Sequence, residues 1–271
     1  MAEGRPSDVG LEATQAIRRA RGVVILTGAG VSADSGVPTF RDPVEGLWKH
    51  YRPEDLATPG AFQRDPCLVW SWYDMRRQAV LDCHPNPGHY AIARFLLHRN
   101  DAVLVTQNVD GLHARALEEV STQEKARGSS GAQDRMLHLH GDILTLRCSR
   151  CSYRERNRDR VDTSSEATLP SCRTCGALLR PAVVWFGEML DQGVLNAAFE
   201  AAARAQVCLV AGTSAVVHPA ASIPQATAQG GGSIVEVNPE ETPLSRLAQW
   251  QIREGAGVAL PRILSGVDEY S

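Results

Sequence analysis

The sequence has 271 residues, of which 43% are hydrophobic and 22% charged, and its formal net charge is −3. This length suits one large domain, or a large domain that carries a smaller one, and the charge gives no general electrostatic reason to bind nucleic acid or an anionic membrane. No apolar run approaches the roughly 18 residues of a membrane span, and the first twenty residues lack the apolar core of a secretory signal. We expect a cytoplasmic protein, with an organelle left open, and favour a monomer.

Apolar runs and helical stretches alternate along the chain. Residues 8–20 have the pattern of an amphipathic helix, and the apolar run 23–26 follows. Further runs at 102–105, 207–211 and 233–237 are short, continuous and rich in Val, Leu or Ile, which is typical of strands buried on both faces of a parallel sheet. Helical stretches, such as 87–99 and 193–205, separate them. The alternation predicts an α/β fold, a Rossmann-like parallel sheet with helices on both faces.

Two segments interrupt this alternation. Residues 46–86 are rich in Trp, Pro and Arg and predict a helical module, whereas residues 147–180 hold two cysteine pairs and predict a small zinc module. We expect these modules to form a small domain beside a discontinuous Rossmann-like domain. That large domain would comprise residues 1–45, 87–146 and 181–271. The polar stretch 118–135 is expected to be a mobile surface loop.

The predicted strands end in small or hydrogen-bonding residues. The four ends are Thr27 to Ser32, Thr106 to Asp110, Gly212 to Ser214, and Asn238 to Glu240. Gly28 and Gly30 would let backbone N–H groups approach a phosphate at a helix N-terminus. Taken alone, Gly28-Ala29-Gly30 lacks the third glycine of the usual dinucleotide fingerprint, so a tight strand-to-helix turn is the alternative. Because ligands of open α/β sheets bind beyond the carboxyl ends of the strands, the four ends together favour a nucleotide site.

Four of the seven cysteines form two C-x-x-C pairs. Cys148 and Cys151 are separated by 20 residues from Cys172 and Cys175, which matches the spacing of tetrahedral thiolate zinc sites. Four protein ligands leave no position for water, so this zinc ion would be structural. A pair of redox dithiols is the alternative, although neither pair has a thioredoxin-like βαβ context.

His140 lies eight residues before the first cysteine pair. A histidine after an alternating Leu137-His138-Leu139 segment is more often structural, and we expect only one of His138 and His140 to face the ligand crevice. A neutral imidazole there could remove a proton from a sugar hydroxyl near neutral pH.

Together these residues resemble the sirtuins, the NAD-dependent protein deacylases. The resemblance runs from about Val23 to Leu260. Besides the cysteine quartet, it rests on GAGVSADSGVPTFR (28–41), TQNVDGLH (106–113), LHGD (139–142), VVWFGE (183–188), GTS (212–214) and VNPE (237–240).

The resemblance implies that NAD is consumed as a co-substrate. The acyl oxygen of an acyl-lysine protein or peptide would attack the nicotinamide ribose, His140 would act as general base, and lysine, nicotinamide and O-acyl-ADP-ribose would be released. The residues that would contact NAD are Gly28, Ala29, Gly30, Ser32, Ala33, Phe40, Arg41, Gln107, Asn108, Asp110, Gly212, Thr213, Ser214, Asn238, Glu240 and Ala256. The segment that would pair with the substrate backbone as an added strand comprises Val184, Phe186, Gly187 and Glu188.

Tyr73 and Arg76 suggest the acyl group. They are three residues apart in a predicted helix and share a face. A guanidinium and a phenol can grip a carboxylate, and the pair resembles the one that marks class III sirtuins, which remove succinyl, malonyl and glutaryl groups. Ala57 would leave the acyl pocket wide. The alternative is that Arg76 is a solvated charge and Tyr73 a core aromatic.

Other activities stay open on the sequence. The same NAD site could serve a deacetylase or a protein mono-ADP-ribosyltransferase, and a non-enzymatic NAD sensor or a hydride-transferring oxidoreductase are further alternatives. The presence of both Asn108 and His140 speaks against a sensor, since a sensor needs no base. No nucleic-acid or membrane partner is expected.

Overall fold

The computed structural model describes residues 6–37, 51–124 and 129–265. Phe40 and Arg41 lie outside the described residues. The strands of the described part form two sheets. Their bounds are β1 (Val23–Thr27), β2 (Ala102–Thr106), β3 (Met136–His138), β4 (Gly141–Cys148), β5 (Arg154–Arg156), β6 (Leu179–Val183), β7 (Val207–Ala211), β8 (Ser233–Val237) and β9 (Trp250–Ile252).

The larger sheet is parallel throughout, in the order β3-β2-β1-β7-β8-β9. Numbered along this sheet alone, the order is that of the Rossmann fold, in which the strand order reverses between β1 and β7 and a ligand crevice forms beside the strand ends. The four predicted strands are confirmed as β1, β2, β7 and β8, and the short β3 and β9 extend the sheet at its edges. Continuous burial of β1 and β7 explains their uninterrupted apolar sequences.

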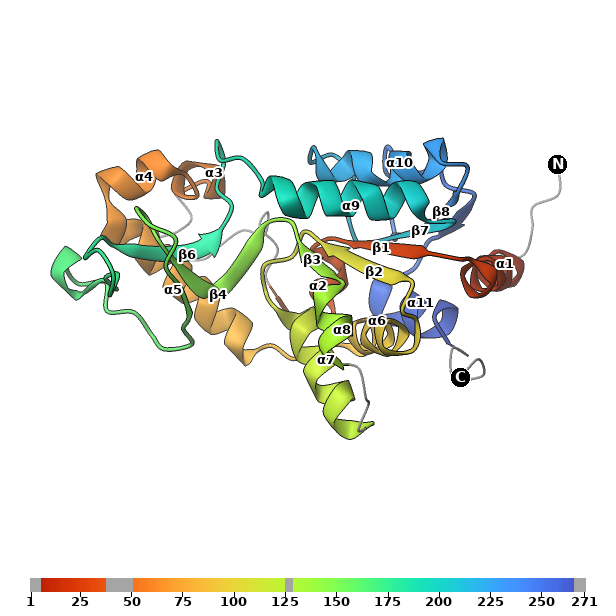
Figure 1. Cartoon of the computed structure of the whole chain (residues 1–271), viewed down its shortest axis with the longest axis horizontal. Helices are drawn as coiled ribbons and strands as arrows, with labels where there is room; N and C mark the ends of the chain where they lie inside the picture. The colour runs from red at the N-terminus through yellow and green to blue at the C-terminus, as the bar shows by residue number, and fades with distance from the viewer. Residues whose placement is uncertain (1–5, 38–50, 125–128, 266–271) are drawn as a thin grey trace.

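Helices cover both faces of this sheet, as predicted (Figure 1). Their apolar faces, with those of the strands, make two separate core clusters. One face carries α1 (Pro6–Arg19), α6 (Pro87–His98), α7 (Leu112–Gln123), α8 (Ser129–Asp134) and α11 (Ala256–Ile263). The other carries α9 (Gln192–Arg204), α10 (Ile223–Gln229) and the 3-10 turn η3 (Ala220–Ser222), and the four-residue α2 (Gly30–Ala33) follows β1.

The expectation of a mobile loop at 118–135 was wrong for the residues that the structure describes. Residues 118–123 belong to α7 and residues 129–134 form α8. The sparse apolar positions of this polar stretch, Val120 and Ala132, are fully buried in the core. Arg135 then donates to the carbonyl oxygens of Leu96, Ala102 and Gly131, which ties the segment to the sheet.

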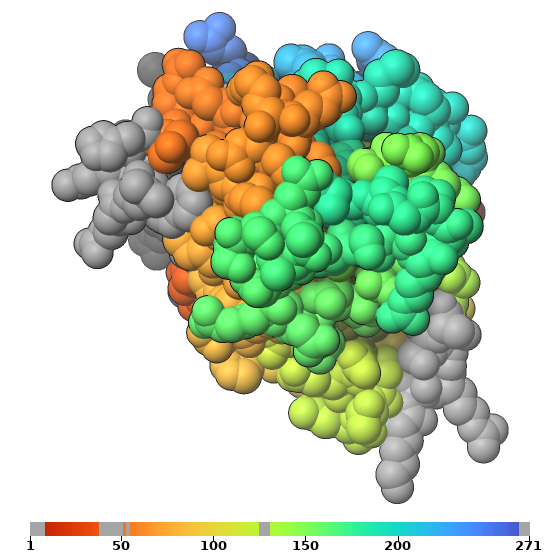
Figure 2. All heavy atoms as spheres, turned by 90° about the vertical axis from the view of Figure 1, so that its left-hand side faces the viewer, coloured from red at the N-terminus to blue at the C-terminus, as the bar shows by residue number. Residues whose placement is uncertain are grey.

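The smaller sheet is antiparallel, in the order β5-β4-β6, and lies beside the helices α3 (Pro53–Leu56), α4 (Pro59–Arg64) and α5 (Pro66–Asp82). It extends from Gly141 to Val183 and so reaches beyond the expected 147–180 segment at both ends. The 3-10 turn η2 (Glu166–Thr168) lies between β5 and β6. Figure 2 shows the two segments side by side, the helices in orange and the antiparallel segment in green.

One core cluster joins these two segments. Trp70, Trp72 and Phe62 of the helices are buried with Leu146 and Trp185 of the antiparallel segment. The indole N–H of Trp70 donates to the carbonyl oxygen of Leu179, 2.9 Å away. We call this unit the small lobe, residues 51–82 and 141–185. None of the described helices is long and apolar enough to cross a membrane.

Candidate active site

Three glycines allow the turns after β1 and β7 to interlock. A Cβ on Gly28 would lie 2.7 Å from the Thr213 Cβ, and one on Gly30 would lie 2.8 Å from the Gly212 Cα. The amide of Gly28 donates to Ala211, and that of Gly30 donates to Gly212. These two amides therefore hold the turns together, and glycine is needed for their close approach. That other backbone N–H groups of this turn approach a phosphate stays a prediction.

The four predicted strand ends and His140 meet in one hydrogen-bonded cluster. Gln107 Nε2 donates to Thr213 Oγ1 at 3.1 Å, and Asn238 Nδ2 donates to the Thr213 carbonyl at 2.8 Å. The ends of β2, β7 and β8 are thereby joined. We call this group the strand-tip cluster; its members are Ser32, Gln107, Asn108, Asp110, His140, Thr213 and Asn238.

Ser32 is the buried centre of this cluster. Its hydroxyl donates to Asp110 Oδ2 at 2.8 Å and accepts from Asn108 Nδ2 at 3.1 Å. His89 Nδ1 accepts the Asn86 amide, so its Nε2 carries the proton and donates to Ser32 as well, 3.3 Å away. Burial lowers the pKa of His89 to about 4, which keeps it neutral at physiological pH. Every hydrogen-bonding capacity of the Ser32 oxygen is used, which fixes Asn108 and Asp110.

Asp110 is a buried carboxyl whose pKa is raised by desolvation, an effect partly offset by hydrogen bonds from the Leu112 amide and the Ser32 hydroxyl. A second histidine, His113, packs against His89 with ring centres 4.7 Å apart. Its Nε2 lies 3.1 Å from Thr27 Oγ1, and its buried Nδ1 has no partner among the described residues. His113 belongs to the TQNVDGLH motif (106–113), which by itself assigns it no role, and no motif indicates His89.

His140 has the geometry of a base. Its Nδ1 lies 3.0 Å from the carbonyl oxygen of Gln107, and since a carbonyl can only accept, Nδ1 carries the proton and Nε2 keeps its lone pair. Burial lowers the pKa of His140, and the bond to Gln107 offsets part of that shift. The imidazole is therefore neutral near pH 7 and able to accept a proton at Nε2. His138 lines a groove bounded by α7 and β4.

The residue after His140 must be glycine. Gly141 has a φ of +86°, and a Cβ there would lie 1.9 Å from the carbonyl oxygen of Ala182. The close approach of β4 to β6 at this point also allows the Val184 amide to donate to the His140 carbonyl oxygen at 2.9 Å. His140 is thus fixed on one side to β2 and on the other to the segment that follows β6.

The remaining predicted cofactor residues lie around the strand ends. Ala29 and Ala33 are exposed beside Ser32, and Ser214 and Glu240 are exposed after β7 and β8. Ala256 is buried at the start of α11, where its carbonyl would lie 3.0 Å from a Cβ on Gly88. Asp34, for which the sequence predicts no role, accepts the amide of Gly257 and ties this helix start to α2.

The segment after β6 is a turn and not a strand. The amides of Val184, Phe186 and Glu188 already donate to His140, Ala57 and Trp185 respectively. Phe186 is half exposed, while Ala57 is buried beneath the turn. The prediction that Val184 to Glu188 pairs with a substrate backbone therefore has to use its carbonyl oxygens and the remaining amide, that of Gly187.

A chain of side-chain contacts supports this turn, and we call it the loop network: Tyr73, Arg180, Trp185 and Glu188. Arg180 forms an ion pair with Glu188 and stacks 3.8 Å from the Trp185 ring centre. Glu188 also accepts the Trp185 amide, and the Trp185 indole donates to the Tyr73 hydroxyl at 2.8 Å. Arg180 is not predictable from its local sequence, because nothing there indicates a partner eight residues away.

Tyr73 is buried, and desolvation raises the pKa of its phenol well above the usual value, so it stays protonated. The nearby charge of Arg76 opposes this shift. The Arg76 guanidinium lies 5.0 Å from the Trp72 ring centre. Tyr73 thus has the burial that the core-aromatic alternative expects, while both side chains still lie on one stretch of α5.

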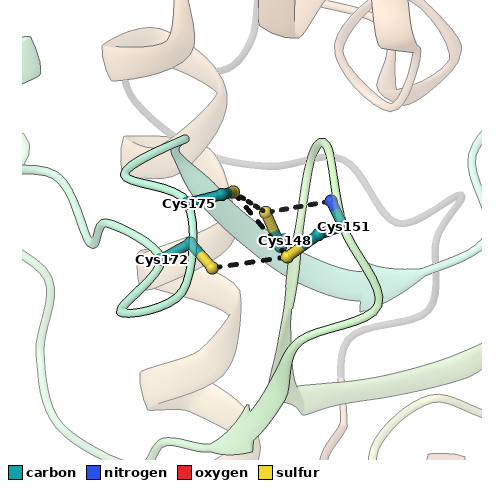
Figure 3. Close-up of side chains that lie close together, drawn as sticks. All are labelled: Cys148, Cys151, Cys172 and Cys175. Carbon is teal, nitrogen blue, oxygen red and sulfur yellow. Dashed lines mark hydrogen bonds between the residues drawn. The ribbon is translucent and has the colours of Figure 1, made fainter.

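The four cysteines converge as predicted (Figure 3). Their sulfur atoms all lie within 4.8 Å of one another, with 3.4 Å between Cys148 and Cys175 and 3.6 Å between Cys151 and Cys172. Thiolates around a tetrahedral zinc ion lie about 3.8 Å apart, whereas a disulfide needs about 2.05 Å. The amides of Arg150 and Thr174 point at the sulfurs of Cys148 and Cys172, as suits thiolate ligands. The donor set therefore fits one structural zinc ion.

A Rossmann-type sheet with a polar strand-tip cluster and a cysteine-held lobe defines a nucleotide-dependent protein with a structural metal site. A sequence profile of the Sir2 family matches residues 28–219. The NAD-dependent protein deacylase 1 of Archaeoglobus fulgidus is 45% identical over 252 residues, which cover 93% of this chain and 95% of that protein. The NAD-dependent protein deacylase of Thermus thermophilus is 46% identical over 255 residues, 92% of each chain.

Solved structures agree. A Sir2 homologue in complex with NAD has a TM-score of 0.83 at 43% identity, covering 96% of this chain and 94% of that one. A Sir2 variant with a deacetylated p53 peptide and 3′-O-acetyl ADP ribose has a TM-score of 0.77 at 30% identity, covering 94% and 96%. The chain belongs to the Sir2 family and is an enzyme of that family.

Proposed function

We propose that this chain, an NAD-dependent protein deacylase of the Sir2 family, removes acidic acyl groups from protein lysines and uses His140 as general base. Bound NAD would supply the ribose that takes the acyl group, with nicotinamide and O-acyl-ADP-ribose as products. The single observation that carries the catalytic part is the meeting of His140 with four polar strand ends in one cluster.

The strand-tip cluster suits a ribose and an amide. Asn108 and Asp110, fixed by Ser32, would bind the nicotinamide half, and Thr213, Asn238 and the exposed residues after them would bind the adenosine half. His140 would accept a proton from a ribose hydroxyl at Nε2, because Nδ1 is committed to Gln107. The neighbouring backbone holds the ring, so proton transfer needs no reorientation.

The preference for an acidic acyl group rests on Tyr73 and Arg76. The Tyr73 oxygen accepts from Trp185, which leaves its own proton free to donate to a carboxylate, and its raised pKa preserves that proton. Arg76 would supply the positive charge, and buried Ala57 occupies little space beneath. Succinyl, malonyl and glutaryl groups each carry the required terminal carboxylate.

The test compares succinyl-lysine and acetyl-lysine peptides of the same sequence. A charged hydrogen bond contributes roughly 1.5–3 kcal/mol, so Arg76→Met should lower kcat/KM for the succinyl peptide by about 10- to 100-fold and spare the acetyl peptide. Arg64→Met, an exposed arginine of the same helical segment, is the matched control. Equal losses on both peptides would overturn the acidic preference and leave a deacetylase. Nicotinamide release that requires an acceptor protein but no acyl group on it would indicate ADP-ribosyl transfer instead.

A further inference from the structure

A groove lies apart from the strand-tip cluster, none of whose members line it. It has a volume of about 1060 Å³ and is bounded by α7 and β3 on one side and by β4 and β5 on the other. Val184 and Met189, at the two ends of the turn after β6, also line it. The groove therefore begins behind the proposed substrate segment and extends along β4 into the small lobe.

Strand pairing places three arginines on the small-lobe wall of this groove. Arg147 on β4 lies directly opposite Arg154 on β5, and Arg156 lies opposite Thr145 on the same face. Like charges at directly opposed positions of an antiparallel pair destabilise the sheet. Residues 147–160 hold six arginines and two acidic residues, in a chain whose net charge is −3.

None of these three arginines forms an ion pair in the described part of the chain. Glu155, which separates two of them on β5, accepts the Tyr153 hydroxyl and pairs with Arg173. The carboxylate of Asp142 is engaged by the Leu144 amide and the Thr145 hydroxyl. The wall therefore carries positive charge that an anionic ligand would compensate.

We propose that this groove binds an acidic segment of the acylated substrate protein, a proposal that rests on the proposed deacylase function. A strand rises about 3.3 Å per residue, so the distance along β4 from Gly141 to Arg147 is about 20 Å. An extended peptide covers this distance in about six residues. Acidic side chains about six to eight positions from the acyl-lysine would reach Arg147, Arg154 and Arg156.

A polypeptide fits the groove better than a nucleic acid does. Glu118 and Asp191 also line this groove, as does Arg115, and the two carboxylates would repel a continuous row of phosphates. Leu139, Val184 and Met189 add apolar surface to the lining. A peptide can present apolar residues there and carboxylates only where the arginines lie.

The experiment measures kcat/KM on two acyl-lysine peptides that differ only in an extension distal to the lysine. The extension consists of Asp and Glu in one peptide and of Asn and Gln in the other, and it is placed on each side of the lysine in turn. At low ionic strength the acidic peptide should be favoured by about 3- to 30-fold through KM, given the small contribution of each partly exposed charge. Added salt should reduce the ratio. The groove variant, which combines Arg147→Gln, Arg154→Gln and Arg156→Gln, should lose this preference for the acidic peptide and keep its activity on an unextended peptide.

The matched control is Arg19→Gln, Arg64→Gln, Arg246→Gln, which removes three exposed arginines outside the groove and should keep the ratio. If the groove variant loses zinc or melts early, Arg156→Gln alone replaces it, because this side chain is exposed. Fluorescence anisotropy of the acidic extension without acyl-lysine measures the binding directly, so an absence of turnover does not prevent the test.

A wild-type ratio near one, or a ratio that persists in the groove variant, would overturn the proposal. Stronger competition by a single-stranded oligonucleotide of equal charge than by the acidic peptide would also overturn it and indicate a nucleic-acid site. The ratio of kcat/KM between the acidic and the neutral extension is measured with whichever acyl group the enzyme removes. A failure of the groove proposal is therefore distinct from a failure of the proposed preference for acidic acyl groups.

Discussion

The strand-tip cluster and the loop network both hold polar side chains, but by different means. In the cluster, the sheet brings residues next to strand ends together, and much of the fixation comes from backbone groups, such as the Gln107 and Thr213 carbonyls. In the loop network, side chains hold one another: Arg180 pairs with Glu188 and stacks on Trp185, which donates to Tyr73. The proposed base is thus held by the ends of the sheet, and the proposed acyl pocket depends on packing that substitution can alter.

Removal of zinc should have the largest effect on activity, and it should act through the small lobe, which carries the loop network. Cys148 and Cys172 belong to the same core as Trp70 and Trp185, so Cys172→Ser should abolish zinc binding, unfold the small lobe and eliminate turnover. The measurements are zinc content by elemental analysis, tryptophan fluorescence and deacylation. Cys83→Ser, outside the quartet, should keep one zinc per chain. Full activity of the zinc-free protein would contradict a structural role for the metal.

Loss of the base should stop the chemistry with both regions intact. His140→Ala is expected to lower kcat by about 10²- to 10⁴-fold, because the proposed mechanism uses the lone pair on its Nε2 to accept the ribose proton. Zinc content and thermal stability should match those of the wild type, and His138→Ala, whose side chain lines the separate groove, serves as the control. Substantial turnover by the His140 variant would remove that residue from the role.

Breaking the ion pair should disturb only the loop network. Arg180 is almost fully buried, so Arg180→Met leaves Glu188 without its partner and should destabilise the protein by about 3 kcal/mol and raise KM for acyl peptides. Because the two residues act together, Arg180→Met and Glu188→Gln should be non-additive by about 1–3 kcal/mol in a double-mutant cycle. NAD affinity, measured by calorimetry, should stay unchanged. Additive effects, or an equal loss of NAD binding, would show that the two regions are not independent.

The pH dependence of activity tests the protonation state of His140 in the strand-tip cluster. Burial lowers the pKa of His140, so the imidazole stays neutral and competent until the pH falls below the ordinary histidine value of about 6.5. The acidic limb of kcat/KM should therefore have its midpoint below that value, and activity should fall as the imidazole gains a proton. Gln107 contributes only its backbone carbonyl to this shift, so Gln107→Ala should move the midpoint little. A midpoint above 6.5 would contradict the buried neutral base.

The sequence predicts the large sheet because burial on both faces demands uninterrupted apolar runs, as in β1 and β7. It also predicts the strand-tip cluster, since topology alone brings polar strand ends to one edge. It does not reveal β9, which has only three residues, or the helices within 118–135, whose apolar positions are few. The roles of Arg180 and His89 are not predictable from the sequence either, because packing between segments determines their partners.

The shared core of the small lobe has a consequence for synthesis on the ribosome. The helices that contribute Trp70 and Trp72 emerge well before Leu146 and Trp185, against which they pack. At about 5–20 residues per second, a delay of about 100 residues leaves those indoles without their partners for roughly 5–20 seconds. During that interval nascent chains would expose an aromatic surface that a chaperone could shield, and zinc could be captured only after Cys175 has left the exit tunnel.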